Sequence, residues 1–193
     1  MRHSHEQQVL TDWVKDHKIP NALCVTLTEK QFVNGIPLDG IRSDQNFRHF
    51  LSLLNRKVYK SAFTRFKRKL YIVTVKEVSG TGRHHRHCML ETPKHIKLPS
   101  FVELVDQCWT STDFGYEHTH ISEPYNEDGW YDYILKSRTK AEFLTSIDWK
   151  LMACALMIEQ SRRCRYAESI CRVCRGVNSE FSCVFQCCRD CLP

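Results

Sequence analysis

The fold is decided by Leu70-Tyr71-Ile72-Val73-Thr74-Val75-Lys76-Glu77, in which apolar and β-branched residues predominate. Such a run is typical of a strand. The turn residues Ser79-Gly80-Thr81-Gly82 follow it, and the segment 84–91 again has the composition of a strand. The sequence therefore predicts an antiparallel hairpin over 70–91.

Similar patterns predict the other elements of the same domain. Residues 22–28 and 115–122 have strand composition, and apolar residues at three- and four-residue intervals predict helices at 47–58 and 101–109. Another helix is expected to open near Asp128. Strands followed by helices that cover one face indicate an α+β fold with a largely antiparallel sheet.

The cysteines divide the chain into two parts. Eight of the eleven lie between Cys154 and Cys191. We expect one domain over 1–149 and a helical, Cys-rich C-terminal tail over 150–193, in which thiols or metal ligands are favoured over disulfides. The tail could hold a structural Zn²⁺, because two-residue spacers let paired thiolates reach one ion, or it could be a loosely ordered extension. The candidate zinc ligands are Cys171, Cys174, Cys188 and Cys191, with Cys183 and Cys187 as alternatives.

Positive charge is concentrated between residues 42 and 69. The formal net charge is +6, and this segment holds nine basic residues against the single acid Asp44. Such a block suits phosphate binding, since neutralised phosphates release condensed counterions, although a solvated helix face is the alternative. The expected DNA-binding residues are Arg42, Arg48, Arg56, Lys57, Lys60, Arg65, Lys67, Arg68 and Lys69.

Hydropathy gives no sign of a membrane protein. No apolar run approaches the roughly 18 residues that a membrane span needs. The first residues lead into a polar stretch without the apolar region of a secretory signal. We therefore expect a soluble, cytoplasmic protein without a membrane partner.

Two histidines and a carboxylate form the candidate metal site. Side chains alternate along a strand, so His85 and His87 project from one face with Met89 behind them. If the hairpin pairs Glu77 with His85, the carboxylate joins them and leaves room for water and phosphate oxygens around Mg²⁺ or Mn²⁺. The alternative is a surface glutamate paired with an exposed histidine. The pair His118 and His120 competes for the role but lacks an upstream carboxylate, so we expect it on the sheet surface or facing DNA.

A tyrosine and a lysine supply the third element. Tyr133 and Lys136 are three residues apart, which places them on one face of a helix. A deprotonated phenol can attack a scissile phosphorus, and an ammonium beside it would offer electrostatic help. An amphipathic helix with Tyr133 half buried is the alternative, and Tyr131 competes as the nucleophile.

The order of these motifs resembles that of HUH (histidine-hydrophobe-histidine) rolling-circle replication initiators in their single-tyrosine form. The motifs are Thr26-Leu27-Thr28, then Glu77 with His85-Arg86-His87, then Tyr133-Ile134-Leu135-Lys136. The segments 54–59 and 129–136 are similar to phage- and plasmid-type members in particular. The resemblance covers about residues 22–149.

The resemblance implies a sheet of about five antiparallel strands flanked by helices. It also implies a metal held by Glu77, His85 and His87, a nucleophile at Tyr133 and an auxiliary cation at Lys136. Arg86 departs from the family pattern, because the middle residue of the histidine motif is usually hydrophobic. Arg86 points to the opposite face of the strand, so the metal site can survive, but we expect that face to be less buried than in relatives.

The expected function is to nick and rejoin single-stranded origin DNA through a 5′-phosphotyrosine, leaving a 3′-hydroxyl primer. No Gly-x-x-x-x-Gly-Lys-Ser/Thr loop occurs in the sequence, so a host helicase and a host polymerase are the expected partners. A single-tyrosine HUH transposase or relaxase is the nearest alternative. A non-catalytic DNA-binding protein and a metal oxygenase or hydrolase with two histidines and one carboxylate are the others.

Overall fold

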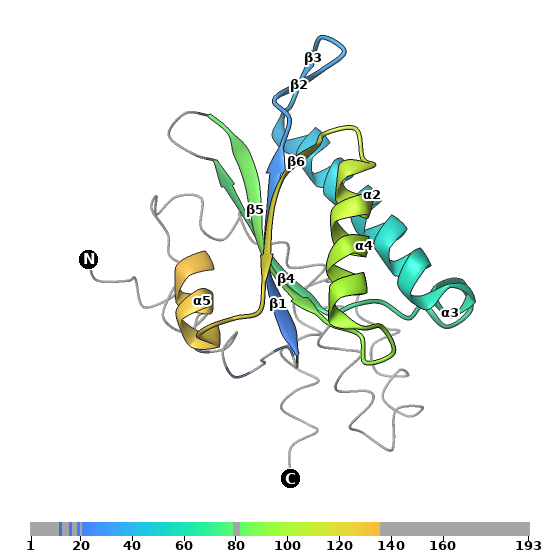
Figure 1. Ribbon diagram of the computed structural model, residues 1–193. Coiled ribbons are helices and arrows are strands. Elements are labelled where there is room, and N and C mark those ends of the chain that lie inside the picture. Colours follow the sequence, from blue (N-terminus) through green and yellow to red (C-terminus); the bar gives the residue numbers. More distant parts are fainter. Residues whose placement is uncertain (1–11, 13–15, 17–18, 20, 79–81, 136–193) are drawn as a thin grey trace, which may run out of the picture. The chain divides into compact units, whose positions relative to one another are not determined.

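The computed structural model describes residues 12, 16, 19, 21–78 and 82–135 (Figure 1). The chain divides into Met1–Asp148 and Trp149–Pro193, and all described residues belong to the first unit. Lys136 and the tail 150–193 lie outside them. The zinc candidates of that tail therefore remain predictions: Cys171, Cys174, Cys188 and Cys191, with the alternatives Cys183 and Cys187.

Four antiparallel strands form the main sheet of the described part, in the order β4-β5-β1-β6. They are β1 (Ala22–Glu29), β4 (Ile72–Val78), β5 (His84–Glu91) and β6 (Gly115–Ser122). The predicted α+β class and antiparallel sheet are confirmed, with four strands where the resemblance implies about five.

The extended residues that follow β1 pair with each other instead of joining this sheet. They form β2 (Phe32–Val33) and β3 (Ile36–Pro37), a separate two-stranded hairpin. Its turn residues Asn34 and Gly35 both have positive φ, 50° and 78°. Two positive φ values are typical of the tight turns that close such hairpins.

Helices lie on both faces of the sheet (Figure 1). The helices α2 (Gly40–Tyr59) and α4 (Leu98–Thr110) cover one face, with the short α3 (Ser61–Phe66) directly after α2. The helix α5 (Glu127–Ile134) lies on the other face. Within the described residues, no helix combines the length and the hydropathy that crossing a membrane requires.

The apolar core lies between the sheet and the pair α2 and α4. Strand alternation directs Leu27 of the central β1 into this layer, where it is fully buried. The rings of Phe50 and Trp109 meet edge to face with centroids 5.5 Å apart. The Trp109 indole N–H donates to the Thr28 carbonyl oxygen (3.1 Å), which ties α4 to the sheet.

Arg86 belongs to this helix-covered face and is buried. Its side chain is 1% exposed. The guanidinium donates to the Asp44 carboxylate (2.5 Å) and to Ser43 Oγ (2.9 Å), and it lies 4.5 Å from the centroid of the Phe47 ring. The cation can be buried because α2 brings a carboxylate, a hydroxyl and an aromatic face to it.

The Asp44 carboxylate also accepts from Lys76 Nζ (3.1 Å). Burial alone would raise the pKa of Asp44, but its hydrogen bonds to Arg86 and Lys76 outweigh burial and hold that pKa below the usual range. Asp44 is therefore ionised near pH 7 and neutralises Arg86. This pairing lets a charged residue stand between two candidate metal ligands on β5.

Replacing Arg86 with alanine should lower the free energy of unfolding by about 3 kcal/mol. This is the lower end of the cost of breaking a buried ion pair, because the Asp44 carboxylate is partly exposed. Urea denaturation followed by circular dichroism measures the change. Arg65→Ala, at an exposed position of α3, is the control and should change stability by less than about 0.5 kcal/mol. Equal midpoints for Arg86→Ala and the parent chain would contradict this account.

Candidate metal centre

The hairpin of β4 and β5 pairs residues in the predicted register. Glu77 lies opposite His85, Val75 opposite His87 and Val73 opposite Met89. Directly paired residues project from the same face of a sheet. The register therefore places the carboxylate and both imidazoles together, as predicted.

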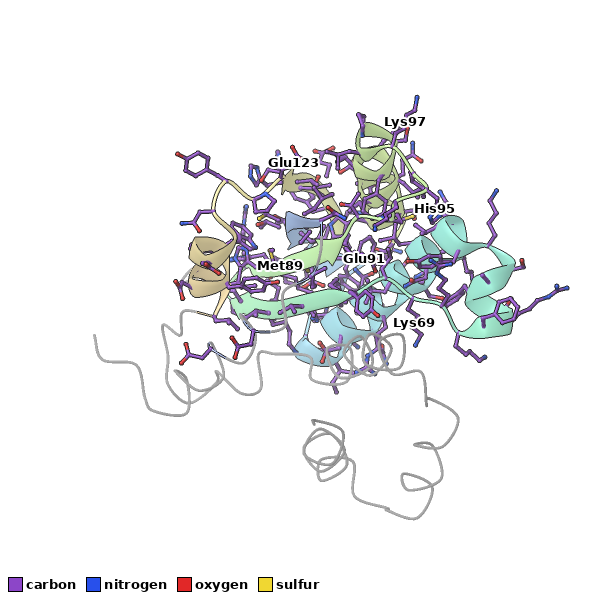
Figure 2. All side chains as sticks on the ribbon, turned by 90° about the horizontal axis from the view of Figure 1, so that it is seen from below. Lys69, Met89, Glu91, His95, Lys97 and Glu123 are labelled. Carbon is purple, nitrogen blue, oxygen red and sulfur yellow. The ribbon has the colours of Figure 1, made fainter. Side chains whose placement is uncertain are left out.

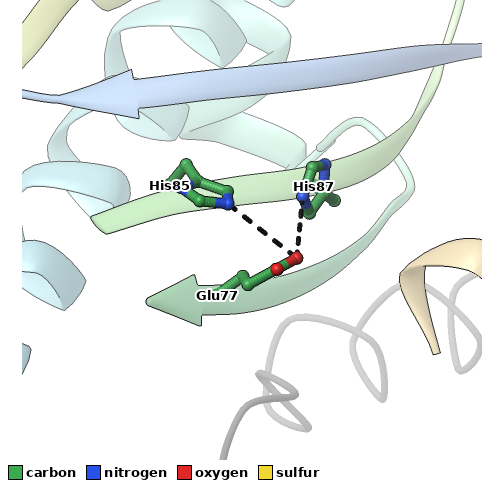
Figure 3. Close-up of side chains that lie close together, drawn as sticks. All are labelled: Glu77, His85 and His87. Carbon is green, nitrogen blue, oxygen red and sulfur yellow. Dashed lines mark hydrogen bonds and ion pairs between the residues drawn. The ribbon is translucent and has the colours of Figure 1, made fainter. Parts of the chain in front are cut away.

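The three side chains converge on one point (Figure 3). Glu77 Oε2 lies 3.1 Å from His87 Nε2 and 3.8 Å from His85 Nε2. One donor atom from each residue lies within 4.8 Å of the other two, so the group could hold a metal ion. Exposure of the side chains rises from 6% at His87 through 20% at His85 to 36% at Glu77. The group is anchored at His87 and open to solvent at Glu77.

Thr26 of β1 fixes the orientation of the buried histidine. Its register position faces His87, and its Oγ1 lies 3.0 Å from His87 Nδ1. In the tautomer in which Nδ1–H donates to Thr26, the lone pair of Nε2 faces Glu77. Metal-binding histidines are commonly held in this way by a partner on the other ring nitrogen.

The electrostatic surroundings favour the neutral form of His87. Burial lowers the pKa of His87, the neighbouring His85 lowers it further, and the opposing effect of Glu77 does not cancel them. The imidazole is therefore neutral near pH 7, which is the form that binds a metal.

Thr26→Val should weaken Mn²⁺ binding by about 10- to 100-fold, because it removes the hydrogen bond that orients His87 and keeps the side-chain shape. Isothermal titration calorimetry measures the affinity. Thr28→Val is a matched control on the same strand, since its hydroxyl has no hydrogen-bond partner among the described residues. Similar affinities for the two variants would show that Thr26 does not support the centre.

Tyr133 lies beside this centre and is accessible. Its ring centroid is 5.3 Å from that of His87, and half of the residue is exposed. Trp130 completes the ring cluster, with centroids 5.3 Å from Tyr133 and 6.0 Å from His87. The competitor Tyr131 is fully buried, and its hydroxyl accepts from the backbone N–H of Ile19 (3.4 Å). Of the two tyrosines, only Tyr133 presents a phenol to solvent beside the triad.

The second histidine pair lies on the edge strand β6, and both of its members are exposed. His120 lies opposite Thr26 and so shares the sheet face of His87. His118 packs against Tyr116, with ring centroids 4.9 Å apart. Among the described residues, the only group of three potential ligands that converges is Glu77 with His85 and His87. This agrees with the expectation that the pair lies on the sheet surface.

The basic residues between 42 and 69 do not join the metal centre. They lie on α2, on α3, between these two helices and in the loop that follows α3. α2 packs on the Arg86 face of the sheet, opposite the triad. Arg42 is half-buried, and its side chain bonds to Asp39 at the start of α2. The other eight are exposed: Arg48, Arg56, Lys57, Lys60, Arg65, Lys67, Arg68 and Lys69.

Two residues that contact the metal centre, Thr26 and Trp130, were not among the site residues predicted from the sequence. Thr26 belongs to a motif recognised in the sequence, but its contact with His87 depends on the pairing of β1 with β5, which the sequence did not predict. Trp130 stands three residues before Tyr133, and that helical spacing is the signal that could have found it.

Comparison of the chain with protein-family models, curated proteins and solved structures gave no match.

Proposed function

We propose that this chain is an HUH-class replication initiator that nicks and rejoins single-stranded DNA through Tyr133. The observation that carries the proposal is the half-exposed Tyr133 ring, packed against His87 of a triad able to hold a metal. A nucleophile, a neutral imidazole and a carboxylate thus lie on one accessible surface. These are the parts that phosphoryl transfer to a tyrosine requires.

The donor set suits a hard divalent cation. Two imidazole nitrogens and one carboxylate oxygen, from His85, His87 and Glu77, leave coordination positions for phosphate oxygens and water, which fits Mg²⁺ or Mn²⁺. Such an ion supplies charge stabilisation to the non-bridging oxygens of the scissile phosphate.

The reaction forms one ester bond and breaks another. Tyr133 Oη attacks the phosphorus in line and loses its proton, and the bond to the 3′ oxygen breaks. That oxygen takes up a proton and leaves as the 3′-hydroxyl, while the 5′ end stays on Tyr133 as a phosphotyrosine. Because the ester is conserved, the 3′-hydroxyl can reverse the step and rejoin the strand without a nucleotide cofactor.

The remaining expectations come from this chemistry and from the resemblance to HUH initiators. Lys136 would stabilise the charge that develops near Tyr133. A host polymerase would extend the free 3′-hydroxyl, and a host helicase would open the duplex. Transposition or mobilisation by the same chemistry is the alternative use, and a DNA element of the phage or plasmid type is the expected setting.

The test uses a single-stranded oligonucleotide library labelled at the 3′ end, with Mn²⁺ or with EDTA. The proposal expects a band on denaturing gels that carries the label with the protein, appears only with the metal and disappears on protease treatment. The same library labelled at the 5′ end should give free fragments that a polymerase can extend. Cleavage without an adduct would instead favour a metal-dependent hydrolase with two histidines and one carboxylate.

A further inference from the structure

A cationic ridge begins in the last turn of α2 and continues through α3 to Lys69. We define it as the exposed residues Arg56, Lys57, Lys60, Arg65, Lys67, Arg68 and Lys69. No acidic residue occurs between Asp44 and Glu77, so the charge of the ridge is not neutralised along the chain. Arg68 packs over the ring of Tyr59, 4.8 Å from its centroid. The ridge therefore presents its cations from the last turn of α2, from α3 and from the residues on either side of α3.

Two lysines of the ridge occupy backbone conformations that favour glycine. Lys60 and Lys67, at the two ends of α3, have φ of 49° and 54°. Lys67 ends α3 in the left-handed conformation, and its N–H bonds the carbonyl oxygen of Ala62. Glycine is the usual residue at this position, because a side chain is strained there. Lysine does not stabilise either of these turns. We therefore attribute its presence at both positions to the positive charge of its ammonium group.

The ridge and the metal centre lie on opposite sides of the sheet. α2 packs on the face of Arg86, whereas His85 and His87 project from the other face, where His87 meets α5. Figures 1 and 2 show α3 and α5 on opposite sides of the sheet, and Lys69 lies toward the α3 side in Figure 2. A single strand bound at Tyr133 would therefore have to pass around the sheet to reach the ridge.

The two sides also differ in chemistry. Around the metal centre the neighbouring side chains are rings, Trp130 and Tyr133 packed against His87. Between residues 56 and 69, which include the ridge, the one exposed large apolar side chain is Phe66. Single-stranded DNA is typically bound by aromatic stacking combined with cations, whereas non-specific binding of a duplex rests mainly on cations that neutralise its phosphates. The rings suit unpaired bases, and the ridge suits duplex phosphates.

We propose that the cationic ridge is a second nucleic-acid site, which binds the phosphate backbone of duplex DNA. The ligand class follows from the density of cations and the scarcity of exposed rings. If the proposed nicking function also holds, this site would bind the duplex that flanks the single strand at Tyr133. The duplex-binding proposal itself does not depend on that function.

The test measures the fluorescence anisotropy of a labelled blunt duplex across a salt series, in EDTA so that no cleavage occurs. Lys67→Gln/Lys69→Gln should weaken duplex binding and flatten the slope of log affinity against log salt by about 0.9 for each lost phosphate contact. The control is Lys97→Gln, an exposed lysine outside the ridge. Lys97 lies far from Lys69 in Figure 2. The control should keep the parent slope.

A second variant separates binding from folding. Lys67→Gly relieves the left-handed strain, so its thermal midpoint should equal or exceed that of the parent while duplex binding falls. An unchanged slope in Lys67→Gln/Lys69→Gln, or an equal loss in the control, would overturn the proposal. The proposal would also be overturned if Lys67→Gln/Lys69→Gln lost as much salt slope on a single-stranded oligonucleotide as on the duplex. Binding of the parent chain to vesicles of anionic lipid in preference to the duplex would overturn it as well. Absence of a covalent adduct would count against nicking and leave duplex binding standing.

Discussion

Replacing Tyr133 with phenylalanine should abolish the covalent DNA adduct and reduce nicking by at least about a thousandfold. The change removes the attacking oxygen and keeps the ring that packs against His87 and Trp130. Folding and Mn²⁺ binding should therefore stay close to those of the parent chain. The adduct is quantified on denaturing gels with the oligonucleotide labelled at the 3′ end, and Mn²⁺ affinity by calorimetry.

The structure offers a matched control two residues earlier. Tyr131→Phe removes a buried hydroxyl that accepts from the Ile19 backbone N–H, so it should cost about 1 kcal/mol of stability and leave adduct formation intact. Tyr125→Phe, at a fully exposed position, should change neither quantity. If Tyr133→Phe still forms the adduct, or if peptide mapping places the DNA on Tyr131, the nucleophile is wrongly assigned, although the metal centre would stand.

The sequence predicted the metal triad because its geometry is local. Glu77 and His85 lie on two strands joined by a tight turn, and alternation along each strand then determines which side chains share a face. A shift of the register by one residue would have moved Glu77 to the opposite face. The prediction assumed the register that pairs Glu77 with His85, and the structure has this register, with Val73 and Met89 paired and buried.

Features that depend on distant pairing could not be predicted in the same way. The contact between Thr26 and His87 joins residues 61 apart in sequence. The burial of Arg86 required α2 to place Asp44 against it, and nothing local to β5 indicates this. The basic residues were recognised as a cluster, yet only the packing of α2 revealed that they face away from the triad.

Glu77→Gln should lower Mn²⁺ affinity by more than about 100-fold and abolish the adduct. Losing the partners of a ligand already costs about 10- to 100-fold, and this change removes the charged ligand itself. The amide keeps the size of the side chain, and Glu77 is partly exposed, so the fold should be retained. The electron paramagnetic resonance signal of free Mn²⁺ reports binding, and circular dichroism reports folding.

The second histidine pair supplies the decisive comparison. His118→Ala/His120→Ala removes two imidazoles from the exposed edge strand and should leave Mn²⁺ affinity within about twofold of the parent, because these residues have no carboxylate converging with them in the described structure. His85→Ala/His87→Ala removes the same number of imidazoles and should eliminate binding, since it leaves Glu77 as the sole ligand. Equal losses in the two double variants would indicate general binding of metal by surface histidines. If only the His118 and His120 variant lost Mn²⁺ affinity, the metal centre would lie on β6. The ion would then be separated from the triad by β1, and the basis for pairing Tyr133 with Glu77 would be removed.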